Sequence, residues 1–309
     1  INAEYGEQML KITSVVGIGH AEEQNIRFRK TMEDSVVMID KFGNNPDLGY
    51  FAVFDGHGGP EAAKSAAEHA HKILIEDIIK QFYPVDEQTP TPPQQLTQLS
   101  PLPATPKMNT SKKLDIDMIE NYQELFKKSM QTVDNLMKER GHVYVGCTAC
   151  ICFVSKRFYT LINVGDSRCI ISQNGIATRL TQDHKASDKK EGERIKAAGG
   201  GIVMGRVNGF ISVSRALGDH CIKQLVISEP DVFRYDRQVL KDEFLIMACD
   251  GVWDVVSDQQ AVDVVKKCLK ESGSPQRAAS ELKNLALRLG TQDNVSVLVL
   301  VVKDPQQLL

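Results

Sequence analysis

Carboxylates stand at the ends of several apolar runs in this sequence. Asp55 directly follows the run at residues 50–54, and Asp250 directly follows the run at 244–249. Apolar runs of this length are typical of buried strands. Three further acids precede two other such runs, at 36–39 and 295–302; they are Glu33, Asp34 and Asp293. Five carboxylates therefore flank four predicted strands, and they would share one cleft if these strand ends converge.

Such a cleft would need divalent cations, because several buried anions repel one another unless they gain counter-charge or protons. Oxygen ligands suit Mg²⁺ or Mn²⁺, whereas Zn²⁺ would want His or Cys at ligand spacing. Two such ions about 3.5 to 4 Å apart can activate a water and hold a phosphoryl oxygen, an arrangement common in phosphate ester hydrolysis. A single Asp-Gly or Asp-Asn pair is more typical of a plain turn. The prediction therefore depends on the whole set.

Two further side chains are placed for phosphate chemistry. His57 lies two residues after Asp55, where imidazole could protonate a leaving alkoxide. Arg29 lies four residues before Glu33, and its planar fork could clamp a phosphate. Taken alone, a single His is more often structural, and Arg29 within a basic run is more often a solvated surface charge.

Composition limits the classes of protein that the chain could belong to. With 42% hydrophobic and 25% charged residues, the 309-residue chain can bury a sizeable core. A net charge of −3 gives no basic footprint for nucleic acid, and no apolar run approaches the roughly 18 residues of a membrane span. We expect a soluble monomer. Because the chain begins at Ile1 rather than Met, an upstream targeting or lipidation segment stays open.

The seven cysteines are an odd number, and five of them lie in apolar, strand-like runs. We interpret these five as buried free thiols, which fits a reducing compartment, cytoplasmic or nuclear. The pair Cys147-x-x-Cys150 is the alternative, a zinc site. No second pair lies at ligand spacing, so the sequence argues against it.

The remaining pattern predicts the elements that position these residues. Apolar residues at a 3.6-residue period predict helices over 60–82 and about 118–136, and an antiparallel meander is predicted over 146–180 with a tight hairpin at Asn174-Gly175. Asp188-x-x-Glu191 resembles a capping box, and helices are also predicted from Ser257 to about 270 and from Ser274 to Gly290. Residues 84–113 hold seven of the twelve prolines, which indicates a disordered Pro/Thr-rich insertion.

Because strands and helices are grouped rather than alternating, the sequence favours an α+β fold of antiparallel sheets with helices packed outside. A doubly wound parallel sheet is the less favoured alternative. We expect one catalytic domain over 1–309.

The ordered set of motifs resembles the metal-dependent protein phosphatase family, protein phosphatase type 2C, from about residue 16 to 302. The matching stretches are Arg29-x-x-Met32-Glu33-Asp34, Asp55-Gly56-His57-Gly58-Gly59, Gly146-Cys147-Thr148-Ala149, Asn163-Val164-Gly165-Asp166-Ser167-Arg168, Ser214-Arg215-Ala216-Leu217-Gly218-Asp219, Asp250-Gly251-Val252-Trp253-Asp254 and Asp293-Asn294-x-Ser296. The resemblance implies a central antiparallel β-sandwich flanked by helices on both sides, in α-β-β-α layers. It also implies phosphoserine and phosphothreonine proteins as substrates.

Residue by residue, the resemblance implies a site for two Mg²⁺ or Mn²⁺ ions at one edge of the sandwich. The implied metal ligands are Asp55, Asp250 and Asp293 through their side chains, Gly56 through its carbonyl, and Glu33 largely through water. Arg29 resembles the phosphate-binding arginine, His57 the general acid, and Asp34 a residue that shapes the water network. Asp166 resembles a residue that holds a weaker third ion with Asp250, and Asp254 one that supports that site. Arg206 falls beside a variable flap at about 185–207.

The approach to Arg29 departs from the family pattern. Residues 19–25 are longer than the usual approach, which leaves open whether Arg29 or Arg27 reaches the phosphate. Cys147 stands where a Ser is common, and residues 219–221 differ from the usual continuation of their motif. None of these departures removes an implied ligand.

The reaction that these residues predict is direct attack of metal-activated water on phosphorus, with no phosphoenzyme. A cysteine nucleophile is rejected, because Cys147 and Cys249 lie in apolar runs. Two alternatives remain: a catalytically inactive fold of this family that regulates a partner protein, and a hydrolase of small phosphate esters. The intact Asp55, Asp250 and Asp293 argue against the first.

Overall fold

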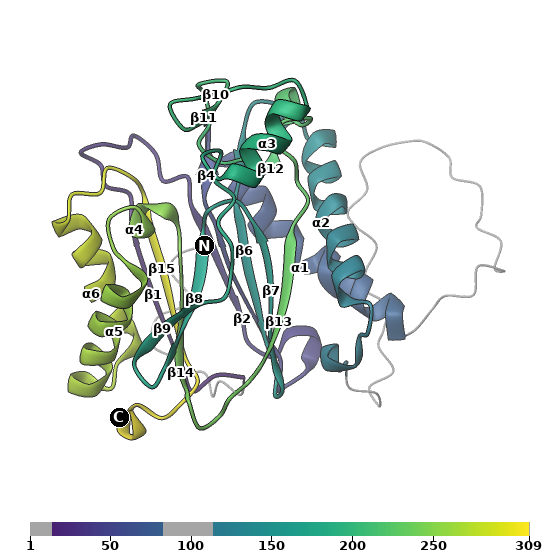
Figure 1. The fold of residues 1–309 in the computed structure, drawn as a ribbon. Coiled ribbons are helices and arrows are strands. Elements are labelled where there is room, and N and C mark those ends of the chain that lie inside the picture. Colours follow the sequence, from purple (N-terminus) through teal and green to yellow (C-terminus); the bar gives the residue numbers. More distant parts are fainter. Residues whose placement is uncertain (1–13, 83–113, 309) are drawn as a thin grey trace.

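Two five-stranded antiparallel sheets pack face to face, and helices cover the outer face of each (Figure 1). The computed structural model describes residues 14–82 and 114–308. Its layers are helices α1 and α2, one sheet, the other sheet, and helices α5 and α6. The predicted α+β sandwich is confirmed. The predicted insertion at 84–113 lies outside the described residues.

The first sheet has the strand order β13-β7-β6-β3-β2, with every neighbouring pair antiparallel. Its strands are β2 (Ser35–Ile39), β3 (Gly49–Phe54), β6 (Ala149–Val154), β7 (Phe158–Val164) and β13 (Asp231–Asp236). Strand β3 is buried along its whole length. Strand β2 is at the sheet edge and only half-buried, so the prediction of a buried strand there was wrong.

The second sheet has the order β1-β15-β14-β8-β9 and is also antiparallel throughout. Its strands are β1 (Gly17–Glu23), β8 (Arg168–Gln173), β9 (Ile176–Arg179), β14 (Asp242–Ala248) and β15 (Val295–Val301). Asn174 and Gly175 both have positive φ angles and form the predicted two-residue hairpin between β8 and β9.

Six α-helices lie in the described residues: α1 (Glu61–Phe82), α2 (Tyr122–Glu139), α3 (Lys189–Ala197), α4 (Asp250–Trp253), α5 (Asp258–Ser272) and α6 (Pro275–Arg288). The described 3-10 helices are η1 (Phe42–Asn44), η2 (Ile116–Met118), η3 (His220–Ile222) and η4 (Pro305–Gln307). Ser257 and Gln260 form a capping box at the start of α5, and Ser274 caps α6. The helix starts predicted at these serines are confirmed.

Alternation along the strands explains why the central runs are apolar throughout. Tyr50, Ala52 and Phe54 of β3 face α1 and α2, whereas Phe51 and Val53 face the other sheet. In the second sheet, β15 likewise presents its valines to α5 and α6 and its leucines to the first sheet. Both faces of the central strands are therefore buried.

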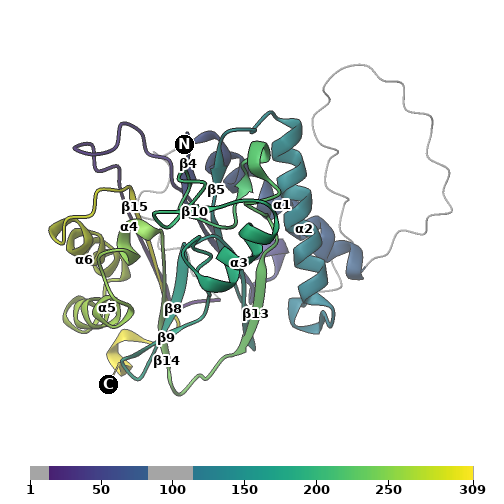
Figure 2. The same cartoon turned by 45° about the horizontal axis from the view of Figure 1, so that its top comes forward.

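Short strands and α3 cover one end of the sandwich (Figure 2). Strands β4 (Gly56–His57), β5 (Gly146–Cys147) and β12 (Leu217–Gly218) form a three-stranded sheet, and β10 (Ile202–Val203) pairs with β11 (Arg206–Val207) as a hairpin. A separate apolar cluster lies beneath α3 and this hairpin. It includes Ile195, Val207 and Leu225.

Three local predictions need correction. The second helix begins at Tyr122, and Met118 lies in η2 with an exposed side chain. Asp188 caps α3, but Glu191 does not return the bond, because it pairs with Arg194 and Arg215. The region 146–180 is not one meander: β6 and β7 belong to the first sheet and β8 and β9 to the second. Local pattern predicts hairpins but not which sheet each one joins.

Leu298 lies fully buried between the two sheets. We expect Leu298→Ala to lower the free energy of unfolding by about 2–5 kcal/mol, because it removes buried methyl groups and leaves a cavity. Urea unfolding would measure this change. Leu289→Ala is the matched control, since Leu289 is exposed, and its cost should stay within about 0.5 kcal/mol. Equal costs for the two variants would contradict the inter-sheet packing.

Candidate active site

Strand direction brings the predicted carboxylates to one end of the sandwich. Asp34 precedes β2 and Asp55 follows β3, and the two strands are antiparallel, so both acids lie at the same end of the first sheet. Asp250 follows β14 and Asp293 precedes β15, which places them together at one end of the second sheet by the same argument. Burial, with added repulsion from the nearby Asp250, Asp34, Asp166 and Asp293, raises the pKa of Asp55. The predicted convergence of these strand ends is therefore observed.

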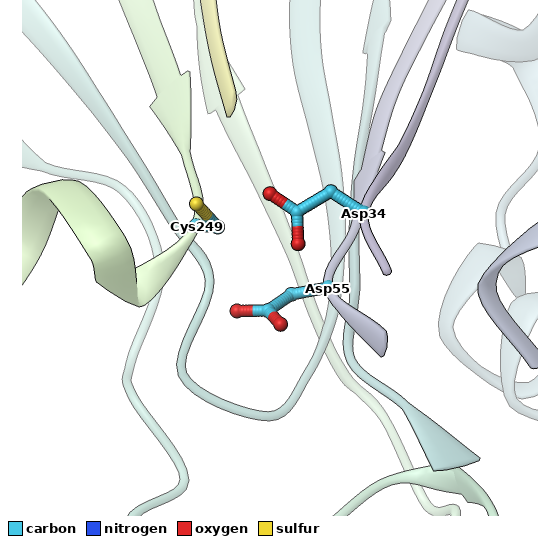
Figure 3. Close-up of side chains that lie close together, drawn as sticks. All are labelled: Asp34, Asp55 and Cys249. Carbon is cyan, nitrogen blue, oxygen red and sulfur yellow. The ribbon is translucent and has the colours of Figure 1, made fainter. Parts of the chain in front are cut away.

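Asp34 and Asp55 of the first sheet point toward Cys249 at the end of β14 (Figure 3). One side-chain atom from each of these residues lies within 4.8 Å of the other two. The thiol of Cys249 donates to the Asn294 carbonyl (3.4 Å) and accepts from the Ser296 amide (3.2 Å). Burial raises the pKa of this thiol well above its usual value, so the carboxylates are the better ligands for a hard cation.

The two ligand-bearing loops of the second sheet approach each other closely. A Cβ atom at Gly251 would collide with the Asn294 carbonyl, so only glycine allows the chain after Asp250 to lie against the Asp293–Asn294 loop. Asp293 Oδ1 accepts from the Asn294 amide (2.7 Å), and its Oδ2 pairs with Arg29. Arg29 thus lies beside Asp293.

Asp166 enters the site from the turn that crosses from the first sheet to the second, between β7 and β8. Its side chain is buried, and Lys185 Nζ lies 3.7 Å from Asp166 Oδ2 and 2.6 Å from Asp254 Oδ1. Asp254 is half exposed at the end of α4. Lys185 therefore lies between Asp166 and Asp254.

Burial and mutual repulsion raise the pKa values of this group. Burial, with added repulsion from Asp250 and Asp293, raises the pKa of Asp34 to about 7. Burial and repulsion from Asp250 raise the pKa of Asp166 to about 8. Burial and repulsion from Asp293 and Asp254 raise the pKa of Asp250 to about 6, and the pKa values of Asp55 and Asp293 are also raised, mainly by burial. Without counter-charge, this site cannot hold all of its carboxylates ionised at neutral pH.

Glu33 and Gly56 lie beside the cluster and are placed by the backbone. Pairing of Ser35 with Phe54 sets Glu33 opposite Gly56, which begins the short strand β4. The Glu33 amide donates to Asn294 Oδ1 (2.9 Å), and Thr31 Oγ1 donates to Glu33 Oε1 (2.8 Å). Glu33 remains partly exposed at the outer edge of the site.

His57 pairs with Asp219, a contact that the sequence reasoning missed. His57 Nε2 lies 2.7 Å from Asp219 Oδ2, and Asp219 is buried in the left-handed backbone region with a φ of 49°. Both groups crowd the position that a Cβ of Gly146 would occupy. The motif ending at Asp219 was noted as part of the family pattern, but nothing in the spacing joins it to a histidine 162 residues earlier.

Arg206 is not brought to the carboxylates by any described contact. It lies exposed on the β10–β11 hairpin, and its Nη1 donates to the Phe210 carbonyl (3.0 Å). Among the described residues it has no ion pair. Lys185 and Asn294, by contrast, bind site residues directly and were not predicted as site residues, although Asn294 lies in a motif quoted above and Lys185 begins the predicted flap.

All seven cysteines are free, and only Cys221 is exposed. Cys147 and Cys150 belong to different apolar clusters, on opposite faces of the first sheet. They do not form the zinc site that was considered as an alternative. No helix in the described ranges, 14–82 and 114–308, is long and apolar enough to span a membrane.

The same fold occurs in a solved structure described as a phosphatase from a pathogenic strain of Toxoplasma gondii. The two chains share 22% identity with a TM-score of 0.70, and the match covers 93% of this chain and 92% of that one. At this identity the likeness establishes the fold alone. The fold and the site together define a class of protein. It is a β-sandwich flanked by helices, with buried carboxylates from both sheets at one end.

The family model described as Protein phosphatase 2C matches residues 18–295. Protein phosphatase 2C homolog 1 of Saccharomyces cerevisiae is 34% identical over 301 residues, covering 91% of this chain and 92% of that protein. Protein phosphatase 2C homolog 1 of Schizosaccharomyces pombe is also 34% identical, covering 94% of this chain and 74% of that protein. The chain belongs to the protein phosphatase 2C family, and it is a protein serine/threonine phosphatase.

The raised pKa values predict how the stability of the metal-free protein depends on pH. The folded protein binds more protons than the unfolded chain, so these carboxyls contribute stability that is full below their ordinary pKa of 3.8 and is lost as pH rises through about 6 to 8. In chelator, the free energy of unfolding should fall by a few kcal/mol across this window. Urea unfolding at several pH values would measure it.

Asp34→Asn should flatten this pH dependence, because it removes one of the repelling charges. Asp263→Asn is the matched control on the exposed side of α5 and should leave the dependence unchanged. A metal-free protein that keeps its stability between pH 6 and 8 would contradict the electrostatic account.

Proposed function

We propose that this phosphatase is Mg²⁺- or Mn²⁺-dependent and hydrolyses phosphoserine and phosphothreonine by direct attack of activated water. The observation that carries the proposal is a buried acceptor without a hydrogen bond: Oδ2 of Asp34 is buried and accepts none, and the equally buried Oδ2 of Asp166 has only the Lys185 ammonium, 3.7 Å away. Buried carboxylate oxygens without partners are costly unless a cation, or a water held by a cation, binds them. Carboxylate oxygens fit a hard divalent ion better than the buried Cys249 thiol does.

Asp55, Asp250 and Asp293 are proposed as direct ligands, with the Gly56 carbonyl and, through water, Glu33. Asp34 would hold water beside the ions, and Asp166 with Asp254 would hold a weaker third ion. When bound, the ions supply an acidified water and positive charge for the phosphoryl oxygens. The repulsion that raises the carboxyl pKa values supports this assignment, because divalent ions offset that repulsion directly.

Arg29 is proposed to bind the phosphoryl group. Its guanidinium contacts Asp293, so it already lies beside a proposed ligand and remains partly exposed. Arg27 instead places its guanidinium 5.3 Å from the centroid of the exposed Phe28 ring. These positions favour Arg29 over Arg27, the choice that the sequence left open.

His57 is proposed to protonate the seryl or threonyl oxygen as the P–O bond breaks. It directly follows Gly56, a proposed ligand, in the sequence, and its ring is partly exposed. The contact of Nε2 with Asp219 fixes the ring and leaves Nδ1 as the nitrogen that can serve the leaving group. A single catalytic domain is proposed, with the α3 and β10–β11 region as its variable flap.

Asp55→Asn tests the metal-dependent activity. With Mn²⁺ or Mg²⁺ and a phosphothreonine peptide, we expect kcat/KM to fall by about a hundredfold or more, because a ligand carboxylate contributes several kcal/mol of charge stabilisation through the ions. Phosphate release with and without chelator is the measurement. Asp263→Asn, an exposed carboxylate on α5, is the control. Activity that survives both chelator and Asp55→Asn would refute the proposal.

His57→Asn tests the proton transfer. A threonyl oxygen is a poor leaving group and needs the proton, whereas p-nitrophenolate leaves without it. We therefore expect kcat for a phosphothreonine peptide to fall about 10²-fold or more, with a much smaller loss for p-nitrophenyl phosphate. Equal losses for the two substrates would mean that His57 acts on folding or metal binding instead.

A further inference from the structure

The segment between β1 and β2, residues 24–31 and here called the 24–31 loop, is fastened to the carboxylate site. Asn25 Nδ2 donates to the carbonyls of Thr291 (2.9 Å) and Asp293 (3.1 Å). Asn294 Nδ2 donates back to the carbonyls of Gln24 (2.7 Å) and Thr31 (3.0 Å). Both ends of the loop are thus bound to the chain around Asp293.

The loop also closes on itself. Gln24 Nε2 donates to the Lys30 carbonyl (3.0 Å), and the amides of Phe28 and Arg29 donate to the Asn25 carbonyl (2.8 and 3.0 Å). In Figure 1 it stands out, in purple, from the same end of the sheets as the β10–β11 hairpin. The loop is therefore a fixed projection at the edge of the site.

This fixed projection presents apolar side chains to solvent. Ile26 is 79% exposed and Phe28 is 46% exposed, and the Arg27 guanidinium lies over the Phe28 ring. Single exposed apolar residues are ordinary, but two within three positions of a hydrogen-bonded loop indicate a contact surface.

The same loop carries cations that the protein does not neutralise. Of its three basic side chains, Arg29 pairs with Asp293, whereas Arg27 and Lys30 have no carboxylate partner in the described part of the chain. The neighbouring acids have other partners than these two cations: Glu23 lies 3.8 Å from Lys283 and accepts from the Asn25 amide (3.1 Å), and Glu33 accepts from Thr31. The surface is therefore cationic and apolar, and it would attract a segment that is anionic and apolar.

We propose that the 24–31 loop is a docking surface for the substrate. It binds the residues that flank the phosphorylated side chain and favours flanks that carry carboxylates and an apolar side chain. The proposal rests on the proposed function, because it places a phosphorylated residue at Arg29 and the carboxylate site. Attachment of the loop to Asp293 and Asn294 is what keeps this surface next to the reacting phosphate.

The test compares two phosphothreonine peptides, one flanked by Glu and Leu and the other by Gln and Ser at the same positions. The variants are Arg27→Gln with Lys30→Gln, and separately Ile26→Ser. The matched control, Lys128→Gln with Lys267→Gln, removes two exposed cations from α2 and α5. Steady-state kinetics on both peptides and on p-nitrophenyl phosphate, which is too small to reach the loop, are measured for each.

The native chain should show a lower KM for the acidic, apolar peptide. The double charge variant should raise that KM about three- to tenfold, as expected for the loss of one or two exposed ion pairs, and Ile26→Ser should raise it less. Values of kcat, p-nitrophenyl phosphate turnover and the control should not change.

Three results would overturn the inference. One is equal KM values for the two peptides in the native chain, which leaves the phosphatase activity intact and refutes only the docking surface. Another is a KM that the loop variants do not change, which would refute docking of the substrate at the loop. The third is an absence of turnover of either peptide with Mn²⁺, which would refute the proposed function as well.

Discussion

Carboxylates buried together repel one another, and this protein gathers five of them from both sheets at one end of its sandwich: Asp34, Asp55, Asp166, Asp250 and Asp293. Burial and this repulsion destabilise the ionised form of each carboxyl, which is why the pKa of each group is raised. The fold must therefore gain its stability from interactions elsewhere in the structure. Apolar clusters on both faces of each sheet supply this stability.

Polar side chains around the cluster fix the loops that carry the acids. Asn294 is the most connected of them, because its amide joins Gln24, Thr31 and the Glu33 amide to the loop of Asp293. Lys185 lies between Asp166 and Asp254, and Arg29 contacts Asp293. Local positive charge and amide groups thus partly offset the repulsion, and divalent ions are proposed to offset the remainder.

Local pattern and strand ends predicted antiparallel sheets with helices outside, the helix caps at Ser257 and Ser274, and the convergence of the acids. The order of the layers came from the family resemblance. It could not predict that the chain crosses between sheets after β7, since hairpin signals do not say which sheet a hairpin joins. The His57–Asp219 pair and the role of Asn294 depend on contacts between distant segments. The spacing of Asp188 and Glu191 resembled a capping box, but the Glu191 carboxylate forms ion pairs with Arg194 and Arg215 instead.

The crossing of the chain between the two sheets has a mechanical consequence. Asp34 and Asp55 lie at the end of one sheet, and Asp250 and Asp293 lie at the end of the other. The distances between the two pairs of carboxylates therefore depend on how the two sheets pack against each other. Substitution of a leucine or cysteine between the sheets could shift one sheet slightly against the other. Such a shift would misalign the reacting groups without unfolding the protein. The catalytic rate would then respond to changes in core packing that leave the free energy of unfolding unchanged. Core variants of normal stability could therefore still be slow enzymes.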